Sequence, residues 1–466
     1  MFNKVCTPLR SQTRTCSSML LRKAKPVVEL DAVTRDLLAK NEIKPRKHSG
    51  VVYRQAVELP TWVTKGIKLI IEGYSARQLM EDSSKFYRHL KGRHPPPEKE
   101  AFEAQFDNLK NEIRQQKRYE NLAPEMEEKV DNAVASKALQ MMRTNVQYSS
   151  SAVNYDYYNS ILYMMARSAP DYAILYKIFH EIKSRDGDFE AKNLLDFGSG
   201  IGTVSWAAAQ FWPTLKEHIC IDASTEICTL AEELAKHAEP KIKGVFHRQF
   251  LPVTAVPKFD VVVSAFGLFD LPDRKSRLEV ILNLWRKTGR YLVLVEQGTN
   301  AGFKVINEAR DCILHILNNS KTQENVSQSY IFSPCPHESK CPKIMVDNGT
   351  PCNFQASYIA FSLKNAKFSR KECYSYIVFR KGGKCDEKEK KWPRLVQPTL
   401  VRSRHSICHM CTPSGKLMEV YFTAGKHERP VYYCARSSEW GDRLPLEIVS
   451  ETQNDTANSV IEVKPK

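Results

Sequence analysis

Three alternating glycines and a preceding aspartate form the stretch of this sequence whose residue types and spacing best suit ligand chemistry. Asp196 ends an apolar run, and the glycines follow at Gly198, Gly200 and Gly202. An apolar run, a glycine-rich turn and an Ala-rich helical segment, in that order, predict a buried strand, a tight turn and a helix start. Glycines are needed in such a turn because a ligand approaches the backbone closely and the turn requires unusual φ angles. The stretch therefore predicts a cofactor site at the end of a buried strand.

The G-x-G-x-G spacing differs from the dinucleotide fingerprint G-x-G-x-x-G. With the preceding aspartate it resembles the first motif of class I S-adenosylmethionine-dependent methyltransferases. A second acidic residue, Asp222, ends the short apolar run 219–221, where a carboxylate can bind ribose hydroxyls. The alternative is a glycine-rich turn of another α/β domain. The agreement of glycines, acidic residue and flanking periodicity favours an S-adenosylmethionine site.

The segments that must position this site alternate between strands and helices. Short apolar runs predict strands, and longer amphipathic runs predict helices; the expected strands are 218–222, 245–248, 259–265 and 291–296, and the expected helices are 224–237 and 276–288. Such alternation is typical of a doubly wound parallel α/β sheet, with its ligand at the carboxyl ends of the strands. Two further strands, 356–362 and 373–380, would be the final antiparallel pair of a class I methyltransferase (Rossmann-like) fold.

Composition divides the rest of the chain into further segments. The first 28 residues contain six basic and no acidic residues and lack a secretory apolar core, which is typical of a mitochondrial transit peptide. The remaining boundaries are predicted as a helical N-terminal domain 29–150, a methyltransferase-like domain 151–385 with a Cys-rich insertion 297–355, a basic β-rich C-terminal extension 386–450, and a disordered tail 451–466. Aromatic residues in 153–175 are expected near the mouth of the cofactor site, on two helices separated by Pro170.

The charge of the chain favours a polyanionic partner. The 466 residues carry a formal net charge of +16, and no stretch of 18 uncharged apolar residues suggests membrane insertion. Nucleic acid is therefore expected before an anionic membrane. Residues 371–436 hold fourteen Lys or Arg against six Asp or Glu, interleaved with the aromatic residues Tyr421, Phe422, Tyr432 and Tyr433. This mixture suits RNA stacking and phosphate contacts, although a solvated basic sheet is the alternative.

The N-terminal helical segment offers a second set of basic residues. Its helices are expected to run from 63 to 87 and from 99 to 142, with a proline-rich linker between them. Two interpretations of these basic residues are equally favoured: they line RNA phosphates, or they are a solvated helical face. The residues are Lys65, Lys68, Arg77, Lys85, Arg88, Lys91 and Arg93.

The cysteines indicate a metal site rather than disulfides. Thirteen cysteines are too sparse for a disulfide scaffold in a chain of this length. Cys335, Cys341 and Cys352 each adjoin a proline in a loop-like stretch, and Cys408 and Cys411 form one C-x₂-C pair. Structural zinc commonly uses two such pairs, whereas the irregular spacing suits an iron–sulfur cubane held by four thiolates. The spacing favours the cluster over zinc and leaves both open.

Several short motifs together resemble one family, the mitochondrial small-ribosomal-subunit proteins related to methyltransferases. They are Ile-Asp-Ala-Ser (221–224), Glu-Gln-Gly-Thr (296–299), Cys-Pro-His-Glu (335–338), Trp-Pro-Arg (392–394), Cys-His-Met-Cys (408–411) and Cys-Ala-Arg-Ser-Ser-Glu-Trp-Gly-Asp (434–442). The resemblance implies a mitochondrial matrix factor that binds small-subunit rRNA and ribosomal proteins during assembly, as a monomer on the particle.

The same resemblance implies a [4Fe–4S] cluster on Cys335, Cys341, Cys352 and Cys408. Cys411 is the alternative fourth ligand, and His409 is not expected to be a ligand. S-adenosylmethionine, which the glycine motif and Asp222 predict, is the second expected cofactor.

Residues for methyl transfer to a base are missing from the expected position. Base N-methyltransferases carry an Asn/Asp-Pro-Pro-aromatic element after the fourth strand, but residues 264–273 lack it and contain no cysteine nucleophile for C5 chemistry. Asp270 could act as a base or contact the donor's amino group. We therefore expect donor binding without turnover. An active rRNA methyltransferase whose acceptor site forms only on the particle, and a redox or iron sensor, are the alternatives.

Overall fold

The computed structural model describes residues 22–23, 27–96, 99–116, 124–146, 153–252, 257–320, 329–346, 349–363, 366–382 and 392–450. Most of the expected transit peptide and the whole expected tail lie outside these ranges. Backbone contacts group the chain into two units. The larger unit comprises residues 52–338 and 351–390, and the smaller unit comprises residues 1–51, 339–350 and 391–466.

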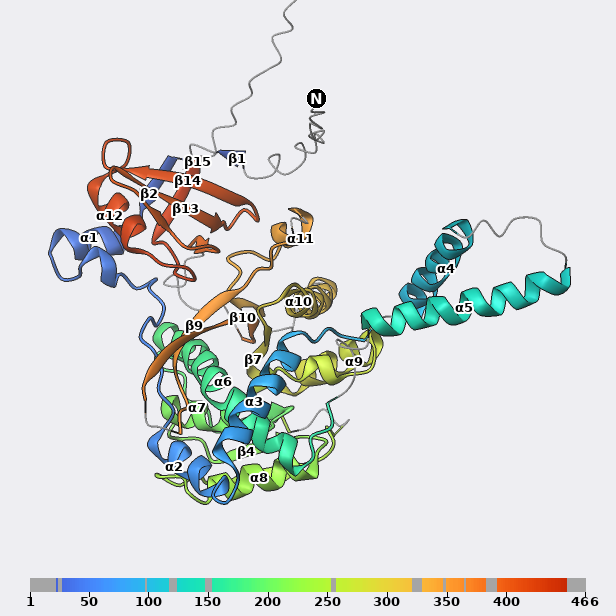
Figure 1. Cartoon of the computed structure of the whole chain (residues 1–466). Coiled ribbons are helices and arrows are strands. Elements are labelled where there is room, and N and C mark those ends of the chain that lie inside the picture. Colours follow the sequence, from blue (N-terminus) through green and yellow to red (C-terminus); the bar gives the residue numbers. More distant parts are fainter. Residues whose placement is uncertain are drawn as a thin grey trace, which may run out of the picture. The chain divides into compact units, whose positions relative to one another are not determined.

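A mixed eight-stranded sheet forms the centre of the larger unit (Figure 1). Its order is β5-β4-β3-β6-β7-β10-β8, with β9 paired to β10. The strands β3 to β7 are parallel to their neighbours, and β10 runs antiparallel to β7, β8 and β9. The bounds are β3 Asn193–Phe197, β4 Glu217–Ile221, β5 Val245–Arg248, β6 Phe259–Ala265, β7 Thr288–Gln297, β8 Tyr330–Ser333, β9 Phe354–Ala360 and β10 Phe368–Arg380.

Helices cover both faces of this sheet. The helices α6, α7 and α8 pack together on one side with α2 and α3, and α9 and α10 contact β6, β7 and β10 on the other. Apolar residues of the sheet, α9 and α10 form a large hydrophobic cluster, which is held together by the hydrophobic effect. The bounds are α2 Thr61–Ile70, α3 Ala76–Lys91, α4 Lys99–Gln116, α5 Pro124–Val146, α6 Tyr157–Arg185, α7 Thr203–Phe211, α8 Thr225–Ala235, η2 Leu268–Asp270, α9 Arg274–Lys287 and α10 Asn300–Ser320.

The expected strands and helices around the glycine motif are present, with ends shifted by a few residues. The prediction that Pro170 separates two helices is wrong, because α6 continues through it. Proline in a helix interior costs about 3 kcal/mol. Eighteen residues of α6 are buried, and this packing outweighs the lost hydrogen bond. The expected helix 63–87 is interrupted instead at Gly73, where φ is +92°.

The segment expected as an insertion contains regular structure. Its first part forms α10, and β8 adds to the edge of the central sheet beside β10. The pairing expected between the last two strands is present, with β9 and β10 joined as an antiparallel hairpin. Amphipathic α10 buries its apolar side in the hydrophobic cluster that it shares with the sheet and α9, and this helical periodicity is visible in the sequence.

The smaller unit joins the two ends of the described chain. Strand β2 pairs antiparallel with β15, and a second sheet has the order β1-β14-β13-β11 with β12 also on β13. Helix α12 packs on β13 and β14 around a separate apolar core. The bounds are β1 Arg22–Lys23, β2 Val27–Leu30, α1 Ala32–Ala39, η1 Pro45–Lys47, α11 Pro342–Val346, β11 Arg394–Leu395, β12 Leu400–Val401, β13 His405–Cys411, β14 Leu417–Thr423, α12 Arg429–Ser437 and β15 Leu446–Ser450.

None of the helices within the described ranges is both long and apolar enough to cross a membrane.

Candidate functional site

The glycine loop joins the carboxyl end of β3 to α7 in a conformation that depends on its glycines. The φ angle is +73° at Gly198, +50° at Gly200 and +89° at Gly202, all in the left-handed region. A Cβ on Gly198 would lie 3.3 Å from the Cα of Gly267, which follows β6. Glycine at position 198 is therefore required both by the backbone angle and by the close approach of a second strand end.

Asp196 is a buried acid that lacks a partner. It is fully buried at the end of β3, and neither carboxylate oxygen has a hydrogen-bond partner among the described residues. Burial, followed by the charge of Asp222, raises the pKa of Asp196 well above its usual range. An unpaired buried polar group is costly and calls for an explanation. S-adenosylmethionine carries a positive charge and an amino group, so it suits this carboxyl group.

Asp222 lies at the end of β4, where the sequence places a ribose-binding acid. Its Oδ2 accepts a hydrogen bond from the Gly200 N–H at 2.9 Å, and its Oδ1 accepts from the Ser224 N–H at 3.1 Å. Burial raises the pKa of this half-buried carboxyl group. A carboxylate has about four lone-pair positions, so about two remain for ribose hydroxyls. Asp222 thus both fixes the glycine loop and retains capacity for a nucleoside.

Asp270 lies in the turn after β6 and is held by an arginine from the N-terminal part of the unit. Its Oδ1 is 2.6 Å from the Nη2 of Arg93, whose side chain is only 4% exposed. The Gln297 amide at the end of β7 donates to the Leu90 carbonyl at 2.7 Å. These contacts place the end of α3 at the loops after β6 and β7. The prediction that Asp270 acts as a base or contacts the donor remains a prediction.

The loop after β6 is also filled from its other side. Phe266 has a φ of +63°, which is unusual for a bulky residue, and the guanidinium carbon of Arg167 lies 4.9 Å from its ring centroid. Arg167 is buried and forms ion pairs with Asp171 and Glu372. The place of the missing acceptor element is therefore occupied by a buried cation–π and ion-pair network.

A carboxyl group beneath the same loop supports its backbone. Glu296 is fully buried, and its Oε1 accepts a hydrogen bond from the Leu268 N–H at 2.9 Å. Burial raises the pKa of Glu296 to about 8. This carboxyl group fixes the 3₁₀ turn that contains Asp270.

Sequence reasoning missed the residues that come from distant parts of the chain. The sequence marks Arg93 only as one of several basic helical residues and gives no local signal for the buried contacts of Arg167 and Glu296. Tyr155 belongs to the aromatic stretch expected at the cofactor site, and its carbonyl accepts from the Ser224 hydroxyl at 2.7 Å. Burial, followed by the charge of Asp270, raises the Tyr155 pKa. Arg93 and Asp270 are too far apart in sequence for any local pattern to reveal their pairing.

The cysteines expected as cluster ligands are all free of disulfides but belong to both units. Cys335 and Cys352 are half-buried in the larger unit, while Cys341 is half-buried and Cys408 fully buried in the smaller unit. Among the described residues, no group of three or more His, Cys, Asp or Glu side chains is arranged to hold a metal ion. The ligand set therefore remains a prediction.

Within the smaller unit, Cys408 and Cys411 occupy different faces of β13. The Cys408 thiol belongs to the apolar core and lies 3.7 Å from the Ala435 carbonyl, and burial raises its pKa to about 12. Cys411 is three residues further along and falls on the opposite face of the strand. His409, on the same face as Cys411, pairs with Glu419 at 3.1 Å. Both thiols are buried, with Cys411 8% exposed, but only Cys408 belongs to the apolar core. Apolar surroundings disfavour the thiolate that binds a metal, so they count against Cys408 more than against Cys411.

The structure divides the basic and aromatic residues of the C-terminal part into internal and exposed groups. Arg380 and Arg394 are buried, and the rings of Phe422 and Tyr432 belong to the core of the smaller unit. Alternation along β14 directs Tyr421 away from that core. The exposed residues of the smaller unit that could meet RNA are Arg402, Arg404, Lys416, Tyr421, Lys426, Arg429 and Tyr433.

The N-terminal basic residues are divided in the same way. Arg93 is buried in its pair with Asp270, and Lys91 pairs with the buried carboxylate of Glu372. Lys85 pairs with Glu81 and Asp82. These residues therefore have partners within the larger unit, which reduces the surface expected for RNA on these helices.

The strand order and the glycine loop define a Rossmann-like domain of the class I methyltransferase type. Residues 157–445 match the family described as "Mitochondrial small ribosomal subunit Rsm22". The chain belongs to this family, and a mitochondrial location follows from that membership.

Two named relatives and one solved structure illustrate the likeness. The chain is 37% identical over 409 residues to human "Ribosome assembly protein METTL17, mitochondrial", covering 86% of each chain. It is 24% identical over 258 residues to Saccharomyces cerevisiae "Ribosome assembly protein RSM22, mitochondrial", covering 36% of this chain and 40% of the relative. The magnesium protoporphyrin IX methyltransferase of Synechocystis PCC 6803 with bound S-adenosylhomocysteine matches with a TM-score of 0.29 and 13% identity, over 52% of this chain and 94% of that chain.

Proposed function

We propose that this chain assists assembly of the mitochondrial small ribosomal subunit by binding its rRNA, with S-adenosylmethionine as a bound ligand that is not consumed. The observation that best supports binding without methyl transfer is that side chains fill the loop after β6. There the buried Arg93 holds Asp270, and Arg167 lies over Phe266. S-adenosylmethionine supplies the methyl group from its sulfonium. Transfer also requires space for the acceptor base beside that methyl group and a protein side chain that orients the base.

The donor side supports ligand binding. Asp196 offers an unpartnered buried carboxyl group, and Asp222 retains acceptor capacity beside the glycine loop. The role in assembly is supported by family membership and by relatives that are named ribosome assembly proteins. Exposed arginines, lysines and tyrosines of the smaller unit support rRNA as the partner. Ribosomal proteins of the same particle are expected as neighbours, with the chain bound as a monomer.

Labelled donor and purified mitochondrial small subunits test this function directly. The full chain is incubated with methyl-labelled S-adenosylmethionine and with particles from cells that lack the protein. We expect saturable donor binding and association with particles, without label on the rRNA. Donor-dependent label on rRNA, abolished by Asp196→Asn, would show that the chain is an active methyltransferase instead. An Asp188→Asn variant, at an exposed aspartate, is the matched control.

We further propose a [4Fe–4S] cluster, with Cys411 in place of Cys408 beside Cys335, Cys341 and Cys352. The proline-flanked spacing supports a cubane, and the position of Cys408 in an apolar core supports the exchange. The cluster would supply four iron–thiolate bonds. The chain's own contribution would be to present thiolates from loops and from the face of β13 opposite the apolar core.

Metal analysis of anaerobically purified full-length protein tests the ligand set. We expect about four iron and four sulfide per chain, lost in Cys411→Ser and retained in Cys408→Ser. Loss in Cys408→Ser with retention in Cys411→Ser would restore the set expected from the sequence. One zinc without iron would replace the cluster by a structural zinc site and leave the assembly role intact.

A further inference from the structure

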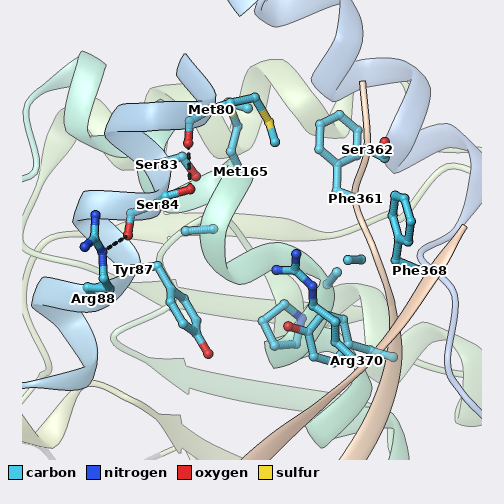
Figure 2. Close-up of a pocket in the computed structure, with 15 residues that line it drawn as sticks. Met80, Ser83, Ser84, Tyr87, Arg88, Met165, Phe361, Ser362, Phe368 and Arg370 are labelled. Atoms are coloured by element: carbon cyan, nitrogen blue, oxygen red, sulfur yellow. Dashed lines mark hydrogen bonds between the residues drawn. The ribbon is translucent and has the colours of Figure 1, made fainter. Parts of the chain in front are cut away.

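A pocket of about 370 Å³ lies in the larger unit between α3, α6 and the β9–β10 hairpin. Its lining does not include the glycine loop or the two aspartates of the donor site. Figure 2 shows residues of α3 along one side of the pocket and residues of the hairpin along the other. The volume lies at the lower end of the range of about 300–1,000 Å³ for small-ligand sites. The pocket could therefore hold a single flat group.

Sequence periodicity explains how the pocket is built. The residues of α3 that line it recur at helical spacing, from Met80 through Ser83 and Ser84 to Tyr87. Phe368 and Arg370 are two residues apart on β10 and therefore share one face of the hairpin. Small residues of α6 beneath them leave the space open. Complementary side chains from three distant segments thus converge on one hollow.

The chemistry of the lining is aromatic and cationic. Phe368 lines the pocket and is 57% exposed, so its ring is available to stack on a bound group. Arg370 has no hydrogen-bond or ion-pair partner among the described residues, and Arg88 uses only its Nε, which donates to the Ser84 carbonyl at 3.3 Å. The residues that line the pocket include no aspartate or glutamate. An occupant that combines a flat ring with a negative charge would satisfy both features.

One aromatic side chain of the pocket is fixed in place. The Tyr87 hydroxyl of α3 donates to the buried Glu372 carboxylate at 2.7 Å, which fixes the ring. A fixed aromatic surface reduces the side-chain entropy that is lost when a base binds.

We propose that this pocket binds one unstacked nucleotide of single-stranded rRNA, with the base against the aromatic side chains and the phosphates at Arg88 and Arg370. The proposal rests on the proposed function, because it names a contact for the RNA that the chain is inferred to bind. A nucleotide fits better than an apolar side chain, since two uncompensated guanidinium groups line the hollow. Duplex RNA would not enter, because its bases are stacked and paired.

Binding of fluorescein-labelled single-stranded decanucleotide RNA to the full chain tests the proposal, with the same sequence as a duplex for comparison. We expect Phe368→Ala and Arg370→Glu to weaken single-strand binding on the order of five- to hundredfold, the usual effect of losing a base stack. Lys371→Glu makes the same change of charge one residue further on, on the opposite face of β10, and should weaken binding no more than about threefold. Phe250→Ala, at another exposed phenylalanine, is the aromatic control.

Photocrosslinking with 4-thiouridine in the same oligonucleotide locates the contact. Crosslinks in peptides 80–88 or 358–370 would support the pocket. Tight RNA binding that is equally sensitive to Arg370→Glu and Lys371→Glu, with crosslinks only in the smaller unit, would overturn the pocket and leave the proposed function standing. Failure of the wild-type chain to bind any small-subunit RNA would overturn both. Circular dichroism of each variant separates loss of binding from loss of fold.

Discussion

The loops after β3 and β6 lie at the same edge of one sheet and have opposite characters. The loop after β3 leaves a buried carboxyl group at Asp196 without a partner and spare acceptor positions on Asp222. The loop after β6 is filled, because Asp270 is paired with a buried arginine and Phe266 is covered by another. The comparison shows that one strand end of this sheet keeps a buried carboxyl group without a partner among the described residues, while its neighbour is part of a buried ion-pair network. We call the loop after β3 the open side and the loop after β6 the filled side.

If the filled side is structural, its network must contribute strongly to stability. Arg167→Met would leave the buried carboxylates of Asp171 and Glu372 without their common partner. We expect the free energy of unfolding to fall by about 3–5 kcal/mol, measured by urea denaturation. Arg77→Met, at an exposed arginine of α3, should change it by less than about 0.5 kcal/mol. A fall below about 1 kcal/mol for Arg167→Met would mean that the network is dispensable.

Glu296 should make the filled side sensitive to pH. Burial raises its pKa from 4.5 to about 8, so the folded protein holds a proton that the unfolded chain releases above about pH 4.5. This stabilisation is present below pH 4.5 and is lost as the pH rises through 8. We expect the stability of Glu296→Gln relative to wild type to increase between pH 5 and 8 by roughly 1 kcal/mol per pH unit. The exposed Glu279→Gln should show no such trend, and a flat difference for Glu296→Gln would contradict the burial argument.

Asp270 distinguishes a structural partner from a donor contact. Asp270→Asn leaves the buried Arg93 with a weaker partner, and we expect a loss of about 1–3 kcal/mol of stability. Affinity for S-adenosylhomocysteine, measured by calorimetry, should stay within about threefold of wild type, since the carboxylate is already engaged by Arg93. A tenfold loss of affinity with unchanged stability would instead assign Asp270 to the donor.

The open side can be disturbed by a single methyl group. In Gly198→Ala the new Cβ would lie 3.3 Å from Gly267 at a φ of +73°. We expect S-adenosylhomocysteine affinity to fall by about tenfold, which corresponds to about 1.4 kcal/mol. Gly73→Ala has a similar φ of +92° but nothing within 4 Å of its Cβ, so it should show the backbone strain alone and keep the affinity. Equal affinities for the two variants would show that the close approach at Gly198 does not shape the donor site.

The sequence predicts the open side much better than the filled side. The residues of the open side are close together in the chain: an apolar run, an aspartate and alternating glycines lie within ten residues, and Asp222 follows one strand–helix–strand unit later. The filled side depends on Arg93 and Arg167, which reach the loop after β6 from α3 and from α6. No periodicity or spacing rule connects such residues, because burial and pairing arise only when the helices pack.

Helix continuity and the cysteine set show the same limit. Pro170 predicts a break by its local chemistry, yet the packing of α6 keeps the helix whole. Cys408 and Cys411 are indistinguishable as thiols in a C-x₂-C pair, and only the alternation of β13 over an apolar core separates them. In both cases the sequence identifies the chemistry of the side chain but does not predict how the packed structure surrounds it.

By itself the sequence determined the strands and helices around the glycine loop, the positions of Asp196 and Asp222 at the ends of two neighbouring strands, and the basic character of the chain, because each depends on neighbours along the chain. Tertiary structure alone decided which arginines face solvent and which are buried against carboxylates. It also decided that β2 and β15 share one sheet and that three distant segments enclose a pocket. The physical reason is that burial, which sets the energy of every charge and thiol here, is a property of the packed chain.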